Sequence, residues 1–341
     1  MVKNCLWKGP QIDGVTQSLL GSFLVCRERF RIKVVEGLRS VDRFNHALEY
    51  GNMFHLCEEV FWSSGNPLVG LGNAPWRKAL LRYCQELAKK YPLQNEEVSK
   101  WYHVCLVQFP IYVDYWKRKD KRKKRSIEQE EVFRVPYELP SGRIVELRGK
   151  RDAVYEIGRG TWLGEHKTKG QIDEQKLQND LTFDLQTMFY LTAMTEEKDW
   201  DKSVKGVVYN VIRRPLSGGR GSIRQGKPTK SKPKGESDES YYNRLVEVIR
   251  DDPGYFFMRW DVKVTAADIE AFKGEFLEPI LEQLWDWWEG VGLRTDSNHY
   301  RQPYGVYNPI ALGLTTDVDE YLRTGSKVGL EKATTLFGEL E

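Results

Sequence analysis

The stretch "RGKRDAVYEIGRGTWLGEHKTKG", residues 148–170, holds the side chains on which the interpretation of this chain depends. Its two halves are rich in β-branched and aromatic residues and are separated by the turn-forming "GRG", which predicts two strands joined by a tight turn. Asp152 lies in the first strand, and Glu165, His166 and Lys167 lie in the second. Because residues i and i+2 of a strand share a face, Glu165 and Lys167 point the same way and His166 points away.

The residue types in this hairpin suit a metal site that acts on phosphate esters. If the two strands pair, Asp152, Glu165 and Lys167 converge on one point. Phosphodiester hydrolysis uses a divalent cation to neutralise developing charge and to activate water, and Mg²⁺ takes only one or two carboxylates from a protein. Lys167 could orient the attacking water, and His166 would offer its backbone carbonyl only. The alternative is that this spacing of an Asp and a Glu-X-Lys arises by chance, because charged residues alternate on the solvent-exposed face of many antiparallel sheets.

Composition indicates a globular protein of one large domain or two small ones. The chain has 341 residues, of which 40% are hydrophobic and 30% charged. No apolar run reaches the roughly 18 residues of a membrane-spanning helix, and "MVKNCLWKGPQIDG" lacks the apolar core of a secretory signal. We therefore expect a cytoplasmic protein without membrane association. The five cysteines are widely spaced without a CxxC pair, which predicts reduced thiols and no zinc site.

Positive charge is concentrated in two runs although the net charge is only +3. "KRKDKRKKR", residues 117–125, has eight cations and one acid, and residues 217–237 have six cations and one acid in a Gly/Ser/Pro-rich background. Such clusters indicate a polyanionic partner, with nucleic acid first. The alternative is that both runs are only solvated loops.

The order of predicted elements changes from helical to mixed near residue 120. Periodicity predicts helices at 18–32, 41–62 (one helix, or a pair broken around Gly51), 76–90, 95–117, 173–195, 239–250 and 265–290, the last capped by Thr265. Alternation or β-branched runs predict strands at 130–139, 141–157, 161–168, 204–212 and 254–264, the last at a sheet edge. The final forty residues show no firm pattern. The expected fold class is α/β, with a helical N-terminal region.

Five motifs along the chain resemble those of the PD-(D/E)XK nuclease superfamily, in its RecB-like, phage-type exonuclease branch, and they occur in the family's order. Asp152 and the Glu-His-Lys-Thr of the second strand match motifs II and III. "GNMFHL" (51–56) matches Gly-X-X-X-His through His55, and "DLQTMFYL" (184–191) matches Gln-X-X-X-Tyr through Gln186 and Tyr190. "SLLGSFLVCRERFRI" resembles the opening pattern of the branch. The resemblance covers about residues 18–212.

The resemblance implies a restriction-endonuclease-like core, with a mixed central sheet flanked by helices, and a helical C-terminal part. It implies a helical region over residues 1–126, a catalytic core over 127–215, a flexible basic loop over 216–238, and a strand and helices over 239–341 that complete the fold.

The implied site contains one or two Mg²⁺ or Mn²⁺ ions. His55, Asp152, Glu165 and the His166 carbonyl would bind them, and Glu131 is a weaker candidate nearby. Lys167 would act on the water, and Gln186 and Tyr190 would contact the strand. The phosphate contacts would come from the 217–237 loop and from Lys117, Arg118, Lys121, Arg122, Lys123, Lys124 and Arg125. Bases could stack on Trp62, Trp101, Tyr102 or Trp116, although core packing is the expected role of most of them. His46 and His103 match no motif and are expected to be structural.

Some members of the branch bind a [4Fe-4S] cluster through one N-terminal and three C-terminal cysteines. Here the last cysteine is Cys105, so four thiolates are not available in that arrangement and no iron–sulfur cluster is expected. Cys26 is then a packing residue, and compact phage-type and recombination exonucleases are the most similar group.

The expected function is metal-dependent hydrolysis of DNA from its ends or single strands, in recombination, repair or phage DNA processing. A bacterial or phage-infected cell is the expected setting, and a helicase or a single-strand annealing protein could be a partner. The alternatives are a structure-specific or nicking endonuclease, a catalytically idle DNA-binding protein that keeps the fold, and RNA as the substrate.

Overall fold

The fold was analysed in a computed structural model. The structure describes residues 5–63, 74–122, 124–182, 184–197, 204–215, 223–231, 233–293, 317–338 and 340. Within these residues no helix is long and apolar enough to cross a membrane.

A mixed five-stranded sheet forms the centre of the molecule. Its strands are β2 (Lys124–Glu138), β3 (Ile144–Ile157), β4 (Gly160–Lys169), β5 (Val204–Arg213) and β6 (Phe257–Lys263), in the spatial order of the chain. All neighbours are antiparallel except β4 and β5, which are parallel. This is the restriction-endonuclease-like arrangement expected from the sequence, with β6 at one edge as predicted. At the other edge, β2 accommodates Pro136, which has no N–H for a further strand.

The connection between β4 and β5 is helical because parallel strands require a crossover. It contains α6 (Glu174–Thr182) and α7 (Leu185–Glu196). The single helix expected over 173–195 is therefore wrong in one respect: the chain forms two helices, and the second begins at Leu185 after its N-cap, Asp184. The side chain of Asp184 accepts a hydrogen bond from the Thr187 N–H and so caps α7.

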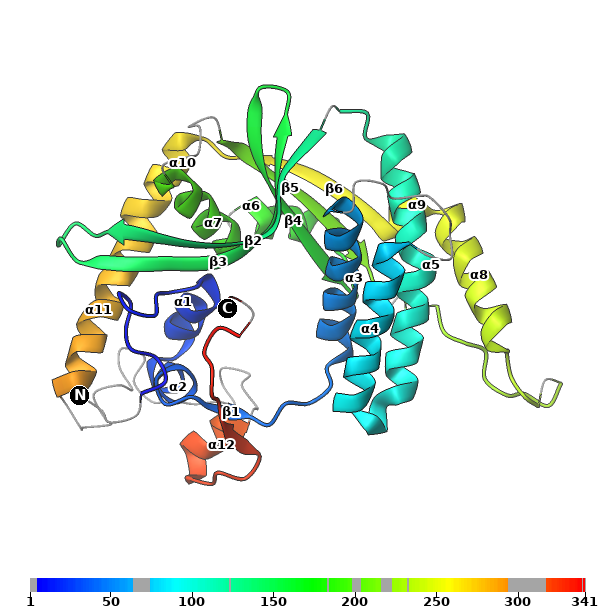
Figure 1. Ribbon diagram of the computed structural model, residues 1–341, viewed down its shortest axis with the longest axis horizontal. Helices are drawn as coiled ribbons and strands as arrows, with labels where there is room; N and C mark the ends of the chain where they lie inside the picture. Colours follow the sequence, from blue (N-terminus) through cyan, green and yellow to red (C-terminus); the bar gives the residue numbers. More distant parts are fainter. Residues whose placement is uncertain are drawn as a thin grey trace.

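Two groups of helices cover the sheet, and Figure 1 shows them to its left and right. One group packs with the β2–β3 hairpin and consists of α1 (Gln17–Val25), α2 (Arg27–Phe30), α7, α10 (Ala266–Phe272), the π-helical turn η3 (Lys273–Leu277) and α11 (Glu278–Leu293). The other packs near the ends of β5 and β6 and consists of α3 (His46–Ser63), α4 (Pro75–Lys90), α5 (Asn95–Lys119), α8 (Asp238–Asp251) and α9 (Pro253–Phe256).

Several predicted helices differ from the observed ones at their ends. The helix expected over 18–32 breaks at Cys26, whose side chain caps α2, and the chain continues as the π-helical turn η1 (Arg31–Val35). The helix expected over 41–62 begins at His46 and passes through Gly51 without a break. The C-terminal helix expected over 265–290 is divided by η3, and its Thr265 cap is confirmed by a capping box with Asp268.

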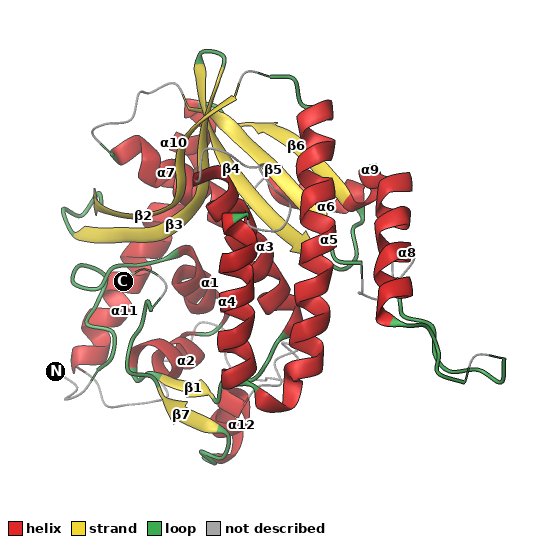
Figure 2. Ribbon diagram, turned by 45° about the vertical axis from the view of Figure 1, so that its right-hand side comes forward, coloured by secondary structure: helices red, strands yellow, loops and turns green. Residues whose placement is uncertain are grey.

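The remaining elements are small. The 3-10 turn η2 (Pro92–Gln94) precedes α5. The C-terminal part contributes α12 (Asp317–Thr324) and β7 (Leu330–Lys332), and β7 pairs with β1 (Leu38–Ser40). Before α8, residues 223–231 and 233–237 form an arm that extends away from the helices in both Figure 1 and Figure 2. The base of the arm is closed by two hydrogen bonds: the Glu236 N–H donates to the Gly226 carbonyl, and the Gly226 N–H donates to the Glu236 carboxylate.

Gly206 is a position where the sheet requires glycine. Its φ is +140°, and a Cβ there would collide with the backbone of Val262 on β6. We predict that Gly206→Ala lowers the free energy of unfolding by more than about 2 kcal/mol, because both backbone strain and overpacking oppose it. Urea denaturation would measure the change. The matched control is Gly21→Ala in α1. A Cβ added at Gly21 would have no atom within 4 Å apart from its own helix, so the free energy of unfolding should rise by up to about 1 kcal/mol. Equal effects of the two changes would contradict the prediction.

Candidate metal centre

The site lies where β3 and β4 separate. Their pairing runs from Ile157 and Gly160 to Ala153 and Gly164, and stops there. Asp152 is the next residue on β3, and its Oδ2 accepts a hydrogen bond of 2.7 Å from the His166 backbone N–H. The carboxylate therefore takes the place of a backbone acceptor at the point where the ladder ends.

Three side chains around Asp152 could hold a metal ion. His55 Nδ1, on α3, lies 3.7 Å from Asp152 Oδ1 and 3.5 Å from Glu130 Oε1. One ligand atom from each of His55, Glu130 and Asp152 lies within 4.8 Å of the others. An imidazole and two carboxylates form a donor set that could hold a divalent metal ion. The structure thus brings together two of the predicted ligands, His55 and Asp152, with Glu130, an acid that matches no motif.

Glu130, and not the neighbouring Glu131, lies beside these ligands. Its neighbours Gln129 and Glu131 pair with Ala153 and Arg151, so Glu130 stands opposite Asp152 in the β2–β3 register. Its φ of 52° interrupts the strand alternation, while Glu131 is exposed. The backbone conformation could not be read from the sequence. The register could have been counted, because the Ser141-Gly142 turn sets Leu139 against Arg143 and therefore residue 130 against residue 152.

Glu165 and Lys167 lie together on β4, and Lys167 contacts the N-terminus of α7. Lys167 Nζ lies 3.2 Å from Glu165 Oε1, 3.4 Å from Asp184 Oδ2 and 3.5 Å from Gln186 Oε1. Glu165 is 2% exposed, and its Oε2 has no hydrogen-bond partner among the described residues. A buried carboxylate oxygen without a donor is costly unless a cation reaches it. The prediction that Glu165 and Lys167 share a face agrees with this placement, and Asp184 is an additional acid here.

Tyr190 and Gln186, on α7, occupy different environments. Gln186 reaches Lys167, as described above. The Tyr190 ring is 6% exposed and packs edge-on against Phe133, with a centroid distance of 5.3 Å. Burial raises the pKa of Tyr190, with a further contribution from the nearby Glu165 charge. Its ring therefore belongs largely to the core, and only the hydroxyl end is near the acids.

His166 turns away from Glu165 and Lys167, as its position in the strand predicts, and is buried against α3. Its Nδ1 lies 2.7 Å from Glu58 Oε2, and its Nε2 lies 3.3 Å from the Tyr155 hydroxyl. The Tyr112 hydroxyl donates to Glu58 Oε1 at 2.7 Å. Burial acts to raise the pKa of Glu58, but the charges of His166 and His55 outweigh it, and the pKa lies below its usual value. Motif reading gave no role to Glu58.

The predicted phosphate-binding run is divided by intramolecular contacts. Arg122 pairs with Asp120 and Asp261, Lys124 lies over the Tyr155 ring, and Arg125 pairs with Glu156. Burial and the charge of Arg259 lower the pKa of Lys124 to about 7. Three of the predicted cations are exposed and make no ion pair with the described residues: Lys117, Arg118 and Lys121. Lys123 lies outside the described residues.

The other proposed nucleic-acid contacts also differ in exposure. In the 223–237 arm, Lys227, Lys230 and Lys234 are exposed, while residues 217–222 and 232 lie outside the described residues. Trp62 is 48% exposed, whereas Trp101 is buried. Trp116 is partly covered by Arg259, 3.9 Å from its ring centroid. Trp62 is thus the most accessible of the four aromatic residues proposed for stacking. Tyr102 and Trp116 are half-buried.

Neighbouring acids raise the pKa of both His55 and Glu165. Burial acts to lower the pKa of His55, but Asp152 and Glu130 raise it to about 10. Burial, with the neighbouring Asp152 charge, raises the pKa of Glu165 above its usual value. His55 therefore carries a proton at pH 7, and a cation that binds to His55 or Glu165 competes with a proton for the same atoms.

We predict that Mn²⁺ binding releases protons and tightens as the pH rises from 6 to 8, by up to about tenfold per pH unit for each proton displaced. The sign follows from the raised pKa values, since fewer protons compete as the pH approaches them. Calorimetric titration with Mn²⁺ at pH 7, in two buffers of different ionisation enthalpy, would count the protons. His55→Gln should release fewer, while His103→Gln, where the ring stacks on Tyr242, should not change the count. Identical enthalpies in the two buffers would rule the prediction out.

Comparisons with known proteins bear on this geometry. The family model described as the PD-(D/E)XK nuclease superfamily matches residues 15–271, which is more than half of the chain and includes every residue of the site described above. No curated protein sequence matches the chain. A solved structure titled "Crystal structure of SSO0001" is similar at 16% sequence identity, over 57% of this chain and 83% of that chain, with a TM-score of 0.22.

Proposed function

The chain belongs to the PD-(D/E)XK nuclease superfamily, and from this premise we propose that it is a Mg²⁺- or Mn²⁺-dependent deoxyribonuclease that degrades DNA from its ends. Membership implies a nuclease, and the His55, Glu130 and Asp152 group could bind a metal. The observation that carries the proposal is the unpartnered, buried Glu165 Oε2 beside the lysine of a Glu-X-Lys pair.

Each residue of the site has a proposed role. His55, Glu130, Asp152 and Glu165 would hold one or two ions, with the His166 backbone carbonyl as a further oxygen ligand. The ion would supply charge neutralisation at the phosphate and a more acidic water. Lys167 is held by Glu165, Asp184 and Gln186, so its ammonium group is positioned to orient the attacking water or to stabilise charge on the phosphate. Gln186 and the hydroxyl end of Tyr190 would contact the strand.

The exposed cations would increase affinity for DNA without selecting a sequence. Lys117, Arg118 and Lys121 at the end of α5, together with the lysines of the 223–237 arm, would neutralise phosphates, so binding should weaken with salt. A helicase or a single-strand annealing protein remains a proposed partner. A catalytically idle DNA-binding protein is the second candidate, and the complete Asp, Glu-X-Lys and His set favours the enzyme over it.

We predict that Glu165→Ala and Lys167→Ala each reduce metal-dependent cleavage of linear DNA by about a hundredfold or more, because each removes a charge placed for the transition state. Cleavage of end-labelled DNA in Mg²⁺, with EDTA as the blank, would measure the loss. The matched control is Lys169→Ala, which removes an exposed lysine two residues further along β4 and should keep the rate. Full activity in either site variant would refute the assignment, and inactivity of the unmodified protein on both DNA and RNA would favour the idle protein.

End dependence is the finer part of the proposal. We predict that the protein degrades linear duplex or single-stranded DNA in Mg²⁺ and leaves covalently closed circular DNA intact, because an end-dependent nuclease needs a free terminus to load. Gel analysis of both substrates in one tube would provide an internal control, and labels at the 5′ and 3′ ends would give the polarity. Nicking or linearisation of the circle would instead establish an endonuclease.

A further inference from the structure

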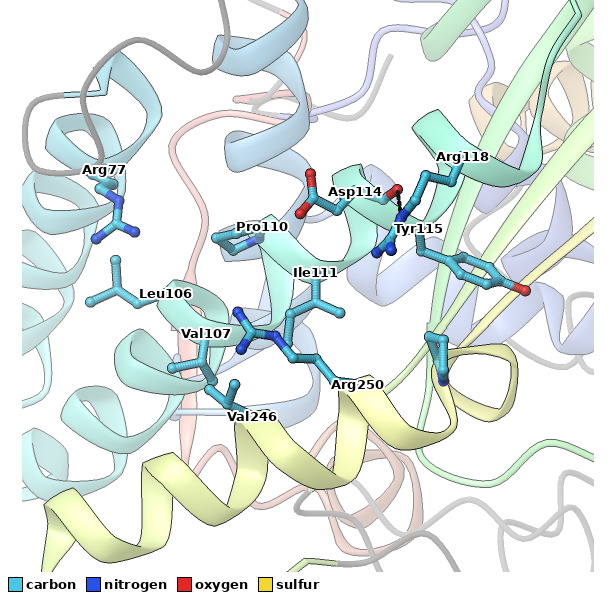
Figure 3. A pocket seen from close by; sticks show the side chains of 11 residues that line it. Arg77, Leu106, Val107, Pro110, Ile111, Asp114, Tyr115, Arg118, Val246 and Arg250 are labelled. Carbon is cyan, nitrogen blue, oxygen red and sulfur yellow. Dashed lines mark hydrogen bonds between the residues drawn. The ribbon is translucent and has the colours of Figure 1, made fainter.

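A groove on the outer face of α5 is separate from the metal centre. It encloses about 510 Å³ between α4, α5 and α8. Figure 3 shows the residues of α5 that form its wall, among them Leu106, Pro110 and Ile111. The opposite face of α5, with Val104, Gln108 and Tyr112, is buried against the core that contains α3. Because α3 carries His55, the body of α5 stands between the groove and the metal centre.

Three arginines from three different helices surround this groove. Arg77 comes from α4, Arg118 from α5 and Arg250 from α8. None of them makes an ion pair with any of the residues that the structure describes, although Arg118 donates to the Asp114 backbone carbonyl at 3.2 Å. Asp114 supplies the one carboxylate in the lining. The groove therefore has excess positive charge, held by side chains that favour bidentate binding of carboxylate or phosphate.

The wall of the groove between the arginines is aliphatic and includes a backbone acceptor. Leu106, Val107, Ile111 and Val246 supply apolar surface. Pro110 lies inside α5 and has no N–H, so the carbonyl of Leu106 four residues earlier lacks its helical donor. Leu106 and Pro110 both line the groove, so the N–H of a ligand bound there is one donor that could replace the missing one.

We propose that this groove binds an acidic peptide segment of a partner protein, with an apolar side chain on the aliphatic wall and carboxylates on Arg77 and Arg250, which leaves Arg118 to the DNA contact proposed above. A peptide satisfies all three features, because it carries carboxylates, apolar side chains and backbone N–H donors. A nucleic-acid strand would satisfy the arginines, but its phosphodiester backbone has no N–H for the Leu106 carbonyl. Its bases stack best on aromatic rings, and the one aromatic ring in the lining, Tyr115, already packs against Trp116 and Phe257. The site would tether the nuclease to a partner without occupying the metal centre.

The test uses a fluorescein-labelled hexapeptide, Asp-Asp-Leu-Phe-Asp-Asp, and the complete protein. Fluorescence anisotropy should show saturable binding that weakens with salt, and that is lost when the acids of the peptide are replaced by Asn. The double variant Arg77→Ala/Arg250→Ala should weaken binding by about tenfold or more, since two charge-assisted contacts are removed. The control Lys78→Ala/Arg82→Ala removes the same charge from exposed positions of α4 outside the groove and should bind as the unmodified protein does.

The outcomes separate this proposal from the proposed nuclease. The thermal unfolding midpoint of the Arg77/Arg250 variant should be unchanged, and so should its cleavage of linear DNA without peptide. Absence of peptide binding, or equal weakening in both double variants, would overturn the peptide site whether or not the protein cleaves DNA. A labelled oligothymidylate that loses affinity only in the Arg77/Arg250 variant, with no peptide binding, would reassign the groove to nucleic acid. Peptide binding by a protein without nuclease activity would keep this proposal and overturn the other.

Discussion

The hydrogen bond from the His166 N–H to Asp152 Oδ2 is the interaction on which the rest of the site depends. It lies where the β3–β4 ladder ends, and it replaces a strand carbonyl with a carboxylate. The two strands can therefore separate without leaving the His166 amide unsatisfied, which would be costly in a buried position. Beyond this point the β4 side chains reach two different helices: Lys167, which pairs with Glu165, contacts the N-terminus of α7, and His166 contacts α3.

The contact of His166 with α3 sets the position of the histidine proposed as a metal ligand. Gly51, His55 and Glu58 lie on one face of α3, since they are separated by four and three residues. Gly51 approaches Thr168, His55 approaches Asp152, and Glu58 makes its 2.7 Å contact with His166. Breaking a buried pair by removing one partner costs about 3–5 kcal/mol. The Glu58–His166 pair thus fixes the distance between α3 and β4, and His55 has little freedom to move away from Asp152.

The parts of this arrangement that could be predicted are those encoded locally or by a shared motif. Alternation and the two turns gave the β2–β3–β4 meander, and motif order placed His55 near Asp152 although about a hundred residues separate them in the chain. Glu130 was not predicted as a ligand, because its own left-handed backbone conformation changes the direction in which the side chains of β2 point. The basic run over residues 117–125 predicts exposed positive charge. In the folded chain, however, Arg122 and Arg125 form ion pairs with acids on β6 and β3, which only the assembled sheet brings near. The cap at Asp184 and the β1–β7 pair likewise depend on tertiary contacts.

Charge pairing explains how so many acids can lie close together in a folded sheet. Three carboxylates near one another would repel, and each has a cationic neighbour of its own: Lys150 lies 2.7 Å from Glu130, Lys167 lies 3.2 Å from Glu165, and His55 lies 3.7 Å from Asp152. Two of these neighbours are lysines, which keep their charge, and the third is a histidine that can release its proton. An ion that enters can therefore replace the proton of His55, and compete with a proton on Glu165, while Lys150 and Lys167 stay in place. The site can therefore be assembled by folding alone, with the acids already held where a divalent ion would need them.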